Sequence, residues 1–203
     1  MAIKLYHCAH ARSMRCVWTL EEMELDYELV TLEFPPRAHH KDYKQVNPLG
    51  TVPCLIDGDA WMTESGAICH YLVDRYGPTP LRVAAHEPDF PLWLDWLHRS
   101  DATLTFPQTL VFRYRDLEPE ERRLPQVVED YRVWFLARLR VLEAALETRD
   151  YLCSGRFTIA DIAIVWALHF AGRLGIAEAF TPNIQAYWDR TTARPAFARA
   201  AAL

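Results

Sequence analysis

The sequence offers little support for a disulfide framework, a metal site or a membrane segment. Its five cysteines form no Cys-x-x-Cys pair and no metal-ligand spacing, and an odd number argues against a set of paired bridges. The first residues lack the long apolar run of a signal peptide, and no run approaches the roughly 18 apolar residues of a membrane span. We therefore expect a protein of the reducing cytoplasm, with no membrane partner and no bound metal.

The chain also lacks a large excess of positive charge. The formal net charge is −5, and the basic residues are scattered without forming a stripe, so nucleic-acid binding has little support. By contrast, 51% of the residues are apolar and 24% are charged, which is typical of a chain that buries a core. A length of 203 residues suits one large domain or two small ones.

The first third of the chain alternates between strand and helix patterns. Strand patterns occupy residues 3–6, 27–32, 53–56 and 60–63, helical patterns occupy residues 13–23 and 65–76, and an irregular helix is expected within 37–46. The Asp57-Gly58-Asp59 sequence is a hairpin signal between the last two strands. This order predicts one sheet with helices packed on it.

The remainder of the chain carries helical periodicity only. Four prolines between residues 77 and 91 indicate a linker. Helices are predicted at residues 92–112, 124–146, 159–172 and 182–192. We therefore divide the chain into a first domain at 1–78, a linker at 79–90 and an α-helical domain at 91–203.

Several motifs occur together in a specific order. They are Val46-Asn47-Pro48-Leu49-Gly50-Thr51-Val52-Pro53, Thr63-Glu64-Ser65, the helix and strand pattern of residues 11–30, Trp96-Leu97-His98, and Phe157-Thr158-Ile159-Ala160-Asp161. In this combination the chain resembles the glutathione S-transferase family, in particular bacterial, theta/zeta-like cytosolic members. The resemblance covers nearly the whole chain.

The resemblance implies an α/β plus all-α fold, with an N-terminal thioredoxin-like domain and a C-terminal α-helical bundle. It also implies a transferase of detoxification type, with glutathione as co-substrate, a small hydrophobic electrophile as second substrate, and a homodimer as the assembly. Thr158 and Asp161 would form a capping box with a structural role.

The resemblance assigns glutathione-binding roles to three places. A cis bond between Val52 and Pro53 would leave the Val52 main chain free to pair with the peptide-like part of glutathione, and Thr51 would add a polar contact. Ser65 at a helix start suits the γ-glutamyl carboxylate, and Glu64 suits the ammonium group.

Basic side chains are the third group of candidates. His39 or His40 would present a cation to the glycine carboxylate of glutathione, and Arg12 would add positive charge. A solvated loop histidine is an equally good interpretation of either residue.

The residue that activates the thiol is the point at which this chain departs from the family. Serine-using members have their catalytic serine four residues before the arginine that matches Arg15, and this position holds Ala11. Ser13 is the nearest replacement, although it suits a plain helix-start residue equally well. His10, which could offer a proton or a cation, is one alternative. Cys8 is the other, because it could form a mixed disulfide with glutathione, although a thiol at a strand end more often packs.

The second substrate would meet apolar side chains of the helical domain. Phe106, Phe112 and Tyr114 are the candidates, and core or dimer contacts are their alternative roles. Two other functions stay open at this point. One is a non-catalytic interaction protein of the transcription-machinery partner type, and the other is a glutathione-dependent thiol-disulfide reductase or isomerase that uses Cys8.

Overall fold

The computed structural model describes residues 3–203, which form two compact units. The first unit consists of the chain up to Arg82 together with Thr192–Leu203, and the second consists of Val83–Thr191. The division near residue 82 falls inside the linker expected at 79–90. The end of the chain differs from the expectation, because residues 192–203 belong to the first unit and not to the helical one.

A four-stranded sheet of order β2-β1-β3-β4 forms the centre of the first unit. Its strands are β1 (Ile3–His7), β2 (Tyr27–Thr31), β3 (Cys54–Asp57) and β4 (Ala60–Met62). β1 and β2 are parallel, whereas the other two pairs are antiparallel. The strand patterns of the sequence are confirmed to within a residue or two at their ends.

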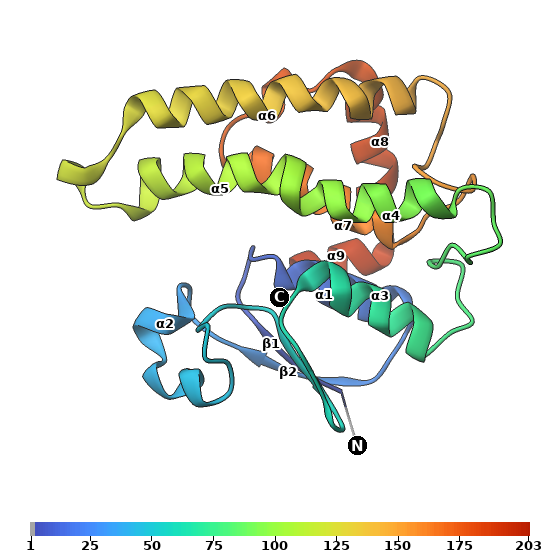
Figure 1. Ribbon diagram of the computed structural model, residues 1–203, viewed down its shortest axis with the longest axis horizontal. Coiled ribbons are helices and arrows are strands. Elements are labelled where there is room, and N and C mark those ends of the chain that lie inside the picture. The colour runs from blue at the N-terminus through green and yellow to red at the C-terminus, as the bar shows by residue number, and fades with distance from the viewer. Residues whose placement is uncertain (1–2) are drawn as a thin grey trace. The chain divides into compact units, whose positions relative to one another are not determined.

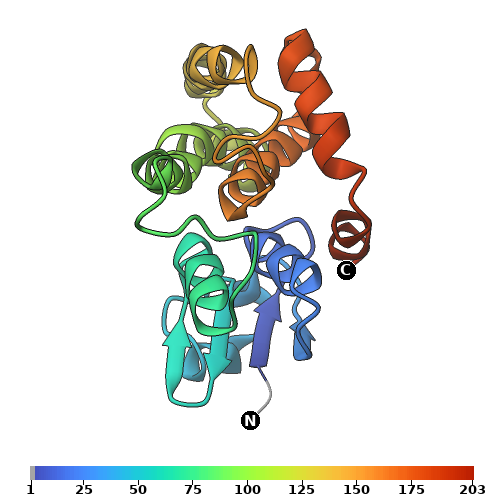
Figure 2. The same cartoon turned by 90° about the vertical axis from the view of Figure 1, so that its right-hand side faces the viewer.

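Two helices of the first unit pack against each other on one face of the sheet (Figure 2). They are α1 (Ser13–Glu22) and α3 (Ser65–Arg75), and both match the predicted helices. The irregular helix expected within residues 37–46 is also confirmed, as α2 (Pro36–His39) and the 3-10 turn η1 (Lys41–Gln45).

The strand register brings four chain segments to one edge of the sheet. Tyr6 near the end of β1 pairs with Cys54 at the start of β3, and Leu55 pairs with Met62 at the end of β4. Because β2 runs parallel to β1, it ends at the same edge. Four segments therefore lie at this edge. They are the turn after β1, the segment after β2, the Val52-Pro53 pair that enters β3, and the Glu64-Ser65 pair that follows β4.

A last helix, α9 (Pro195–Ala201), packs against α1 (Figure 1). The Arg194 guanidinium donates to both carboxylate oxygens of Glu22, at 2.7 and 2.6 Å. The ring of Phe197 meets Trp18 edge to face, with centroids 4.9 Å apart. These contacts join residues more than 170 positions apart, which is why no local pattern assigned this helix to the first unit.

The regular elements of the second unit are helices, and an isolated β-bridge joins Cys153 to Arg156 in the loop before Ile159. Its main helices are α4 (Phe90–Arg99), α5 (Phe106–Phe112), α6 (Pro125–Leu146), α7 (Ile159–Arg173) and α8 (Pro182–Thr192). α6 runs alongside α5 (Figure 1), and α7 is buried along most of its length. None of the helices described is both long and apolar enough to cross a membrane.

A π-helical turn, η2 (Ser100–Thr105), separates α4 from α5. The sequence predicted uninterrupted helix over residues 92–112. Pro107 has no N–H to donate to a carbonyl one turn earlier, which interrupts the helical hydrogen bonding here. Within the π-helical turn, the Thr105 hydroxyl donates to the Ser100 carbonyl at 2.5 Å. A second π-helical turn, η3 (Arg113–Leu117), follows α5.

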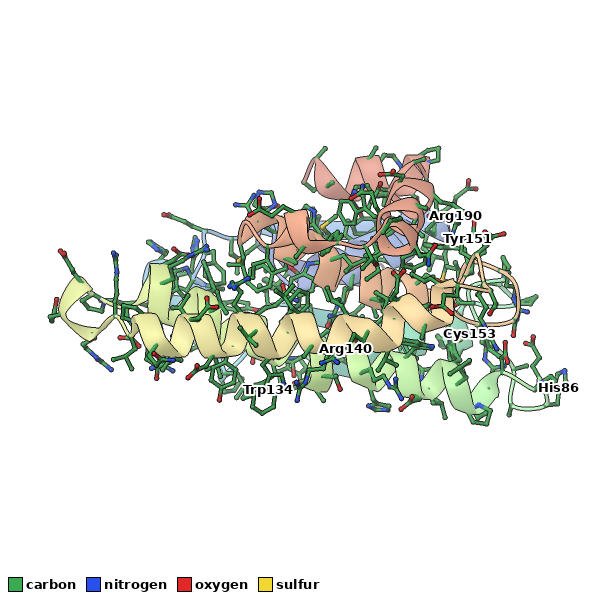
Figure 3. The ribbon with its side chains drawn as sticks, turned by 90° about the horizontal axis from the view of Figure 1, so that it is seen from above. His86, Trp134, Arg140, Tyr151, Cys153 and Arg190 are labelled. Carbon is green, nitrogen blue, oxygen red and sulfur yellow. The ribbon has the colours of Figure 1, made fainter. Side chains whose placement is uncertain are left out.

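The start of α7 is fixed by the capping box that the sequence predicted. The Asp161 carboxylate accepts from the Thr158 N–H at 2.7 Å, the Leu152 N–H at 3.0 Å and the Tyr187 hydroxyl at 2.9 Å. Burial raises the pKa of Asp161 to about 6. Nearby, the Arg190 guanidinium of α8 lies over the Tyr151 ring at 5.7 Å (Figure 3), so the loop before α7 is held from several sides.

Replacing Asp161 with alanine leaves the Leu152 and Thr158 N–H groups buried without their acceptor. We expect Asp161→Ala to lower the free energy of unfolding by about 3–5 kcal/mol, because each stranded donor costs about 1–3 kcal/mol. Tyr187→Phe removes a single donor from the same carboxylate and is expected to cost about 1 kcal/mol. Urea unfolding measures both, and equal losses in the two variants would contradict this account.

Candidate functional site

The segment before β3 is held by two side chains that share one acceptor. The amide of the buried Asn47 donates to the Thr51 carbonyl at 2.7 Å, and the Tyr43 hydroxyl donates to the same oxygen at 2.8 Å. Gly50 has a φ of 61°, and a Cβ there would lie 2.9 Å from Cβ of Arg37. Glycine is therefore required at this turn.

This turn presents the Val52 main chain at the sheet edge. The Val52–Pro53 peptide bond is cis, as the resemblance implied, and Pro53 is buried. Within the described part of the chain, neither the N–H nor the C=O of Val52 has a hydrogen-bond partner. An extended peptide lying along this segment would pair with both groups, in the manner of an added strand.

The start of α3 lies at the same edge. Ser65 is the first residue of the helix and is almost fully buried, whereas the preceding residue, Glu64, is exposed. The Arg15 guanidinium, which is buried in α1, donates to the Ser65 hydroxyl at 3.2 Å. A helix start with an adjacent buried cation favours an anionic group at this position.

The turn between β1 and α1 is organised around Ser13. Its hydroxyl lies 2.9 Å from Nδ1 of His7 and accepts from the Cys8 N–H at 3.3 Å. Ser13 is the first residue of α1 and is fully buried. The sequence left two roles open for Ser13, namely thiol activation and a structural role at the helix start. This geometry favours the structural role, in which Ser13 holds the turn.

Cys8 is also inside the fold, where burial raises the pKa of its thiol to about 11. Such a thiol stays protonated at neutral pH and is a poor nucleophile. All five cysteines are buried and free. The accessible part of the turn is instead formed by the exposed Ala9 and His10 and the half-buried Ala11 and Arg12.

Basic side chains follow β2 at the same edge. A shallow depression of about 420 Å³ is lined by Tyr6, Leu32, His39, His40, Lys41, Asp42, Tyr43 and Val46. Nε2 of His40 accepts from the Glu33 N–H at 3.0 Å, which occupies that nitrogen. His39 is more exposed, and its Nδ1 lies 3.5 Å from a carboxylate oxygen of Glu33. Val52 and Ser65 do not line the depression.

The three aromatic candidates of the second unit do not form one cluster. Phe106 is 50% exposed, and its ring meets Tyr131 of α6 edge to face at 6.3 Å. Phe112 points instead toward α7, where its ring lies 5.7 Å from that of Phe170. Tyr114 is half-buried beneath the Arg113 guanidinium.

Three residues of the site escaped the sequence analysis as functional candidates. Asn47 lies inside the recognised motif but carried no assigned role, and neither did Tyr43. Arg15 served only as a reference point for locating Ala11, although it contacts Ser65. Among residues 3–203, no group of three or more His, Cys, Asp or Glu side chains is placed to hold a metal ion.

The buried His7 predicts acid sensitivity of this turn. Burial and the neighbouring His10 hold the His7 pKa at about 4, below the roughly 6.5 of an unfolded histidine. Neutral His7 therefore contributes stability above pH 6.5, and this contribution is lost as the pH falls toward 4. Between pH 7 and 4.5 we expect the free energy of unfolding to fall by about 2–3 kcal/mol more in the wild type than in His7→Asn.

Urea unfolding at both pH values measures this difference. The raised pKa of Asp161 makes the folded state more stable as the pH falls, which is opposite to the effect of His7. Because Asp161 is present in both proteins, its contribution cancels in the difference between them. His86→Asn, at an exposed histidine, is the matched control and should follow the wild type. Parallel pH profiles for wild type and His7→Asn would contradict the prediction.

Comparison with known proteins gives matches over both units. The model of the glutathione S-transferase N-terminal domain matches residues 1–74, and the model of the C-terminal domain matches residues 118–195. The chain is 33% identical to glutathione S-transferase 3 of Zea mays over an alignment of 201 residues. This alignment covers 93% of this chain and 88% of that protein.

A bacterial relative and a solved structure agree with this match. Identity to glutathione S-transferase GstB of Escherichia coli strain K12 is 30% over 184 residues, covering 88% of this chain and 86% of that protein. The structure of a sphingomonad glutathione S-transferase complexed with glutathione superposes with a TM-score of 0.86 at 26% identity, covering 98% of this chain and 97% of that one. Together, the two domain models and the Zea mays relative show that the chain belongs to the glutathione S-transferase family.

Proposed function

We propose that this protein is a glutathione transferase that binds glutathione at the edge of the first unit's sheet, stabilises its thiolate and directs it at a small hydrophobic electrophile. One observation carries the proposal. A main-chain edge at Val52 without partners, a helix start at Ser65 and basic side chains after β2 all lie at the edge where β1 ends. Glutathione carries a peptide-like centre between two anionic ends, which suits this arrangement.

Each part of glutathione then has a counterpart in the chain. The cysteinyl unit pairs with the main chain of Val52, next to the buried Pro53 and the exposed Thr51. The γ-glutamyl carboxylate is bound by Ser65 and the start of α3, and its ammonium group by Glu64. The glycine carboxylate is met by His39 or His40. Support comes from the sphingomonad relative, whose structure holds glutathione.

Thiolate stabilisation must come from the turn after β1. An ordinary cysteine thiol has a pKa of about 8.5, and lowering it by about two units requires roughly 2.7 kcal/mol of preference for the thiolate. Ala11 has no side-chain donor. We assign the stabilisation to the positive end of α1 together with Arg12 and His10, while Ser13 keeps the turn in place.

The reaction is a nucleophilic attack in which the glutathione sulfur forms a bond to the electrophilic carbon as the leaving group departs with its electron pair. Binding both reactants converts this into an effectively unimolecular step, which supplies much of the rate. Phe112 and Tyr114 are the proposed apolar contacts for the second substrate. The five free thiols suit the reducing cytoplasm as the site of action.

Phe106 belongs with a different set of residues, which we assign to contact with a second copy of the chain. The rings of Phe106, Tyr131 and Trp134 follow one another, with centroids 6.3 and 5.4 Å apart. Trp134 is 43% exposed and carries the Arg138 guanidinium over its ring at 4.2 Å. Such a row of aromatic rings, of which Phe106 and Trp134 are exposed and Tyr131 is half-buried, suits a homodimer interface.

The central test is glutathione binding by calorimetry, combined with the thiolate absorbance of the complex between pH 5 and 9. We expect binding, and a bound thiol pKa about one to two units below that of free glutathione. Cys8→Ala should bind equally well, because the Cys8 thiol is buried and protonated. Ser13→Ala should weaken binding and destabilise the turn without abolishing the shift.

The outcomes separate the proposed function from its rivals. No binding would sink the transferase proposal and favour a non-catalytic interaction protein. Binding with an unshifted thiol pKa would leave a glutathione-holding protein without the proposed chemistry. Loss of all activity in Cys8→Ala would favour the thiol-disulfide enzyme instead.

The dimer assignment has its own test. Trp134→Glu places a charge in the aromatic row and is expected to shift the protein from dimer toward monomer, measured by light scattering after size-exclusion chromatography. Arg140→Glu changes an exposed charge elsewhere on α6 and serves as the matched control (Figure 3). A monomeric wild type, or a variant that stays dimeric, would contradict the assignment.

A further inference from the structure

Arg15 is a buried charged side chain that the proposed function has not yet used. It lies in the first turn of α1 with no exposed surface, and its Nη1 donates to the Ser65 hydroxyl at 3.2 Å. A guanidinium is a cation with five N–H donors and no acceptor. The chain therefore holds a positively charged group directly behind the first residue of α3.

Neighbouring contacts hold this charge in position. The Cys16 thiol lies 3.8 Å from the Ser65 carbonyl, and the Thr19 hydroxyl donates to the Arg15 carbonyl at 2.9 Å. One turn further along, the Thr19 hydroxyl lies 3.2 Å from the Cys69 sulfur of α3. α1 and α3 are thus joined by a short series of polar contacts, and Arg15 is at the end nearest the sheet edge.

The contact also decides what the Ser65 hydroxyl can do. A guanidinium only donates, so the hydroxyl oxygen acts as acceptor toward Arg15 and its proton remains available for another acceptor. A donor that is itself bonded to a cation is polarised and forms a stronger hydrogen bond to an anion. Ser65 therefore transmits the charge of Arg15 to a ligand that Arg15 does not touch.

We propose that Arg15 is a positioning residue for the α-carboxylate of the γ-glutamyl group, which it orders through the Ser65 hydroxyl and attracts by its buried charge. This inference rests on the proposed function, because Arg15 would act on the subsite that binds the γ-glutamyl group of glutathione. It gives Arg15 a part in discriminating ligands by charge, beyond its packing between α1 and α3.

The test compares two ligands that differ at one group. Glutathione and 4-aminobutanoyl-cysteinyl-glycine are identical except that the second lacks the α-carboxylate. Calorimetry gives the dissociation constant of each for wild type, Arg15→Met, Arg15→Lys and Ser65→Ala. We expect Arg15→Met to weaken glutathione binding by about 10- to 50-fold while changing that of the analogue by less than about threefold.

The other variants follow from the same mechanism. Ser65→Ala should lose the same preference for glutathione over the analogue, and Arg15→Met combined with Ser65→Ala should lose little more than either alone. Arg15→Lys keeps the charge without the planar fork and should recover part of the preference. If Arg15→Met fails to fold, Ser65→Ala and Arg15→Lys still test the proposal.

Thr19→Val is the matched control, because it disturbs the α1–α3 contact one turn away without touching Ser65. It should lower thermal stability and leave the ratio of the two dissociation constants unchanged. Equal weakening of both ligands by Arg15→Met would show a merely structural role and overturn the inference. A wild type that binds glutathione no better than the analogue would overturn the inference alone, whereas one that binds neither ligand would remove the proposed function as well.

Discussion

Burial of α1 is the constraint on which the first unit depends. Every residue from Ser13 to Leu20 is buried, and three of them are polar or charged: Ser13, Arg15 and Thr19. Buried polar groups must find partners, and these three find theirs in the turn after β1 and in α3. These contacts allow α1 only one rotation about its own axis. That orientation determines the position of the turn after β1, the position of the start of α3, and which surface of α1 packs against α9.

The elements that the sequence predicted are those whose signals are local. The alternation of residues 27–32, the Asp57-Gly58-Asp59 hairpin and the capping box of Thr158 and Asp161 all act within a few residues. Three features depend on distant contacts or on a break in periodicity, and they escaped prediction. These are the π-helical turns around Pro107, the placement of α9 against α1, and the contact of Arg15 with Ser65 across 50 residues.

The same distinction holds for the candidate site. Val52 and Ser65 became candidates because a recognised motif carries them, and the Val52–Pro53 bond is cis as the motif implied. The thiol-activating group could not be found in this way. Ala11 removes the side chain on which the motif relies, and the choice among its neighbours depends on the direction in which each points. Successive residues at a helix start point about 100° apart, so the Ser13 hydroxyl can face the interior while the preceding residues Ala11 and Arg12 are only half-buried.

The attachment of α9 has a consequence for how the chain reaches its folded state. The helical unit is in effect an insertion, because residues 192–203 return to complete the surface of α1. During synthesis, Trp18 and Glu22 emerge from the ribosome early, but their partners Phe197 and Arg194 are made last. Domains generally fold as units in the order of synthesis. Here the unit that begins first can close its core only after the other has been fully translated.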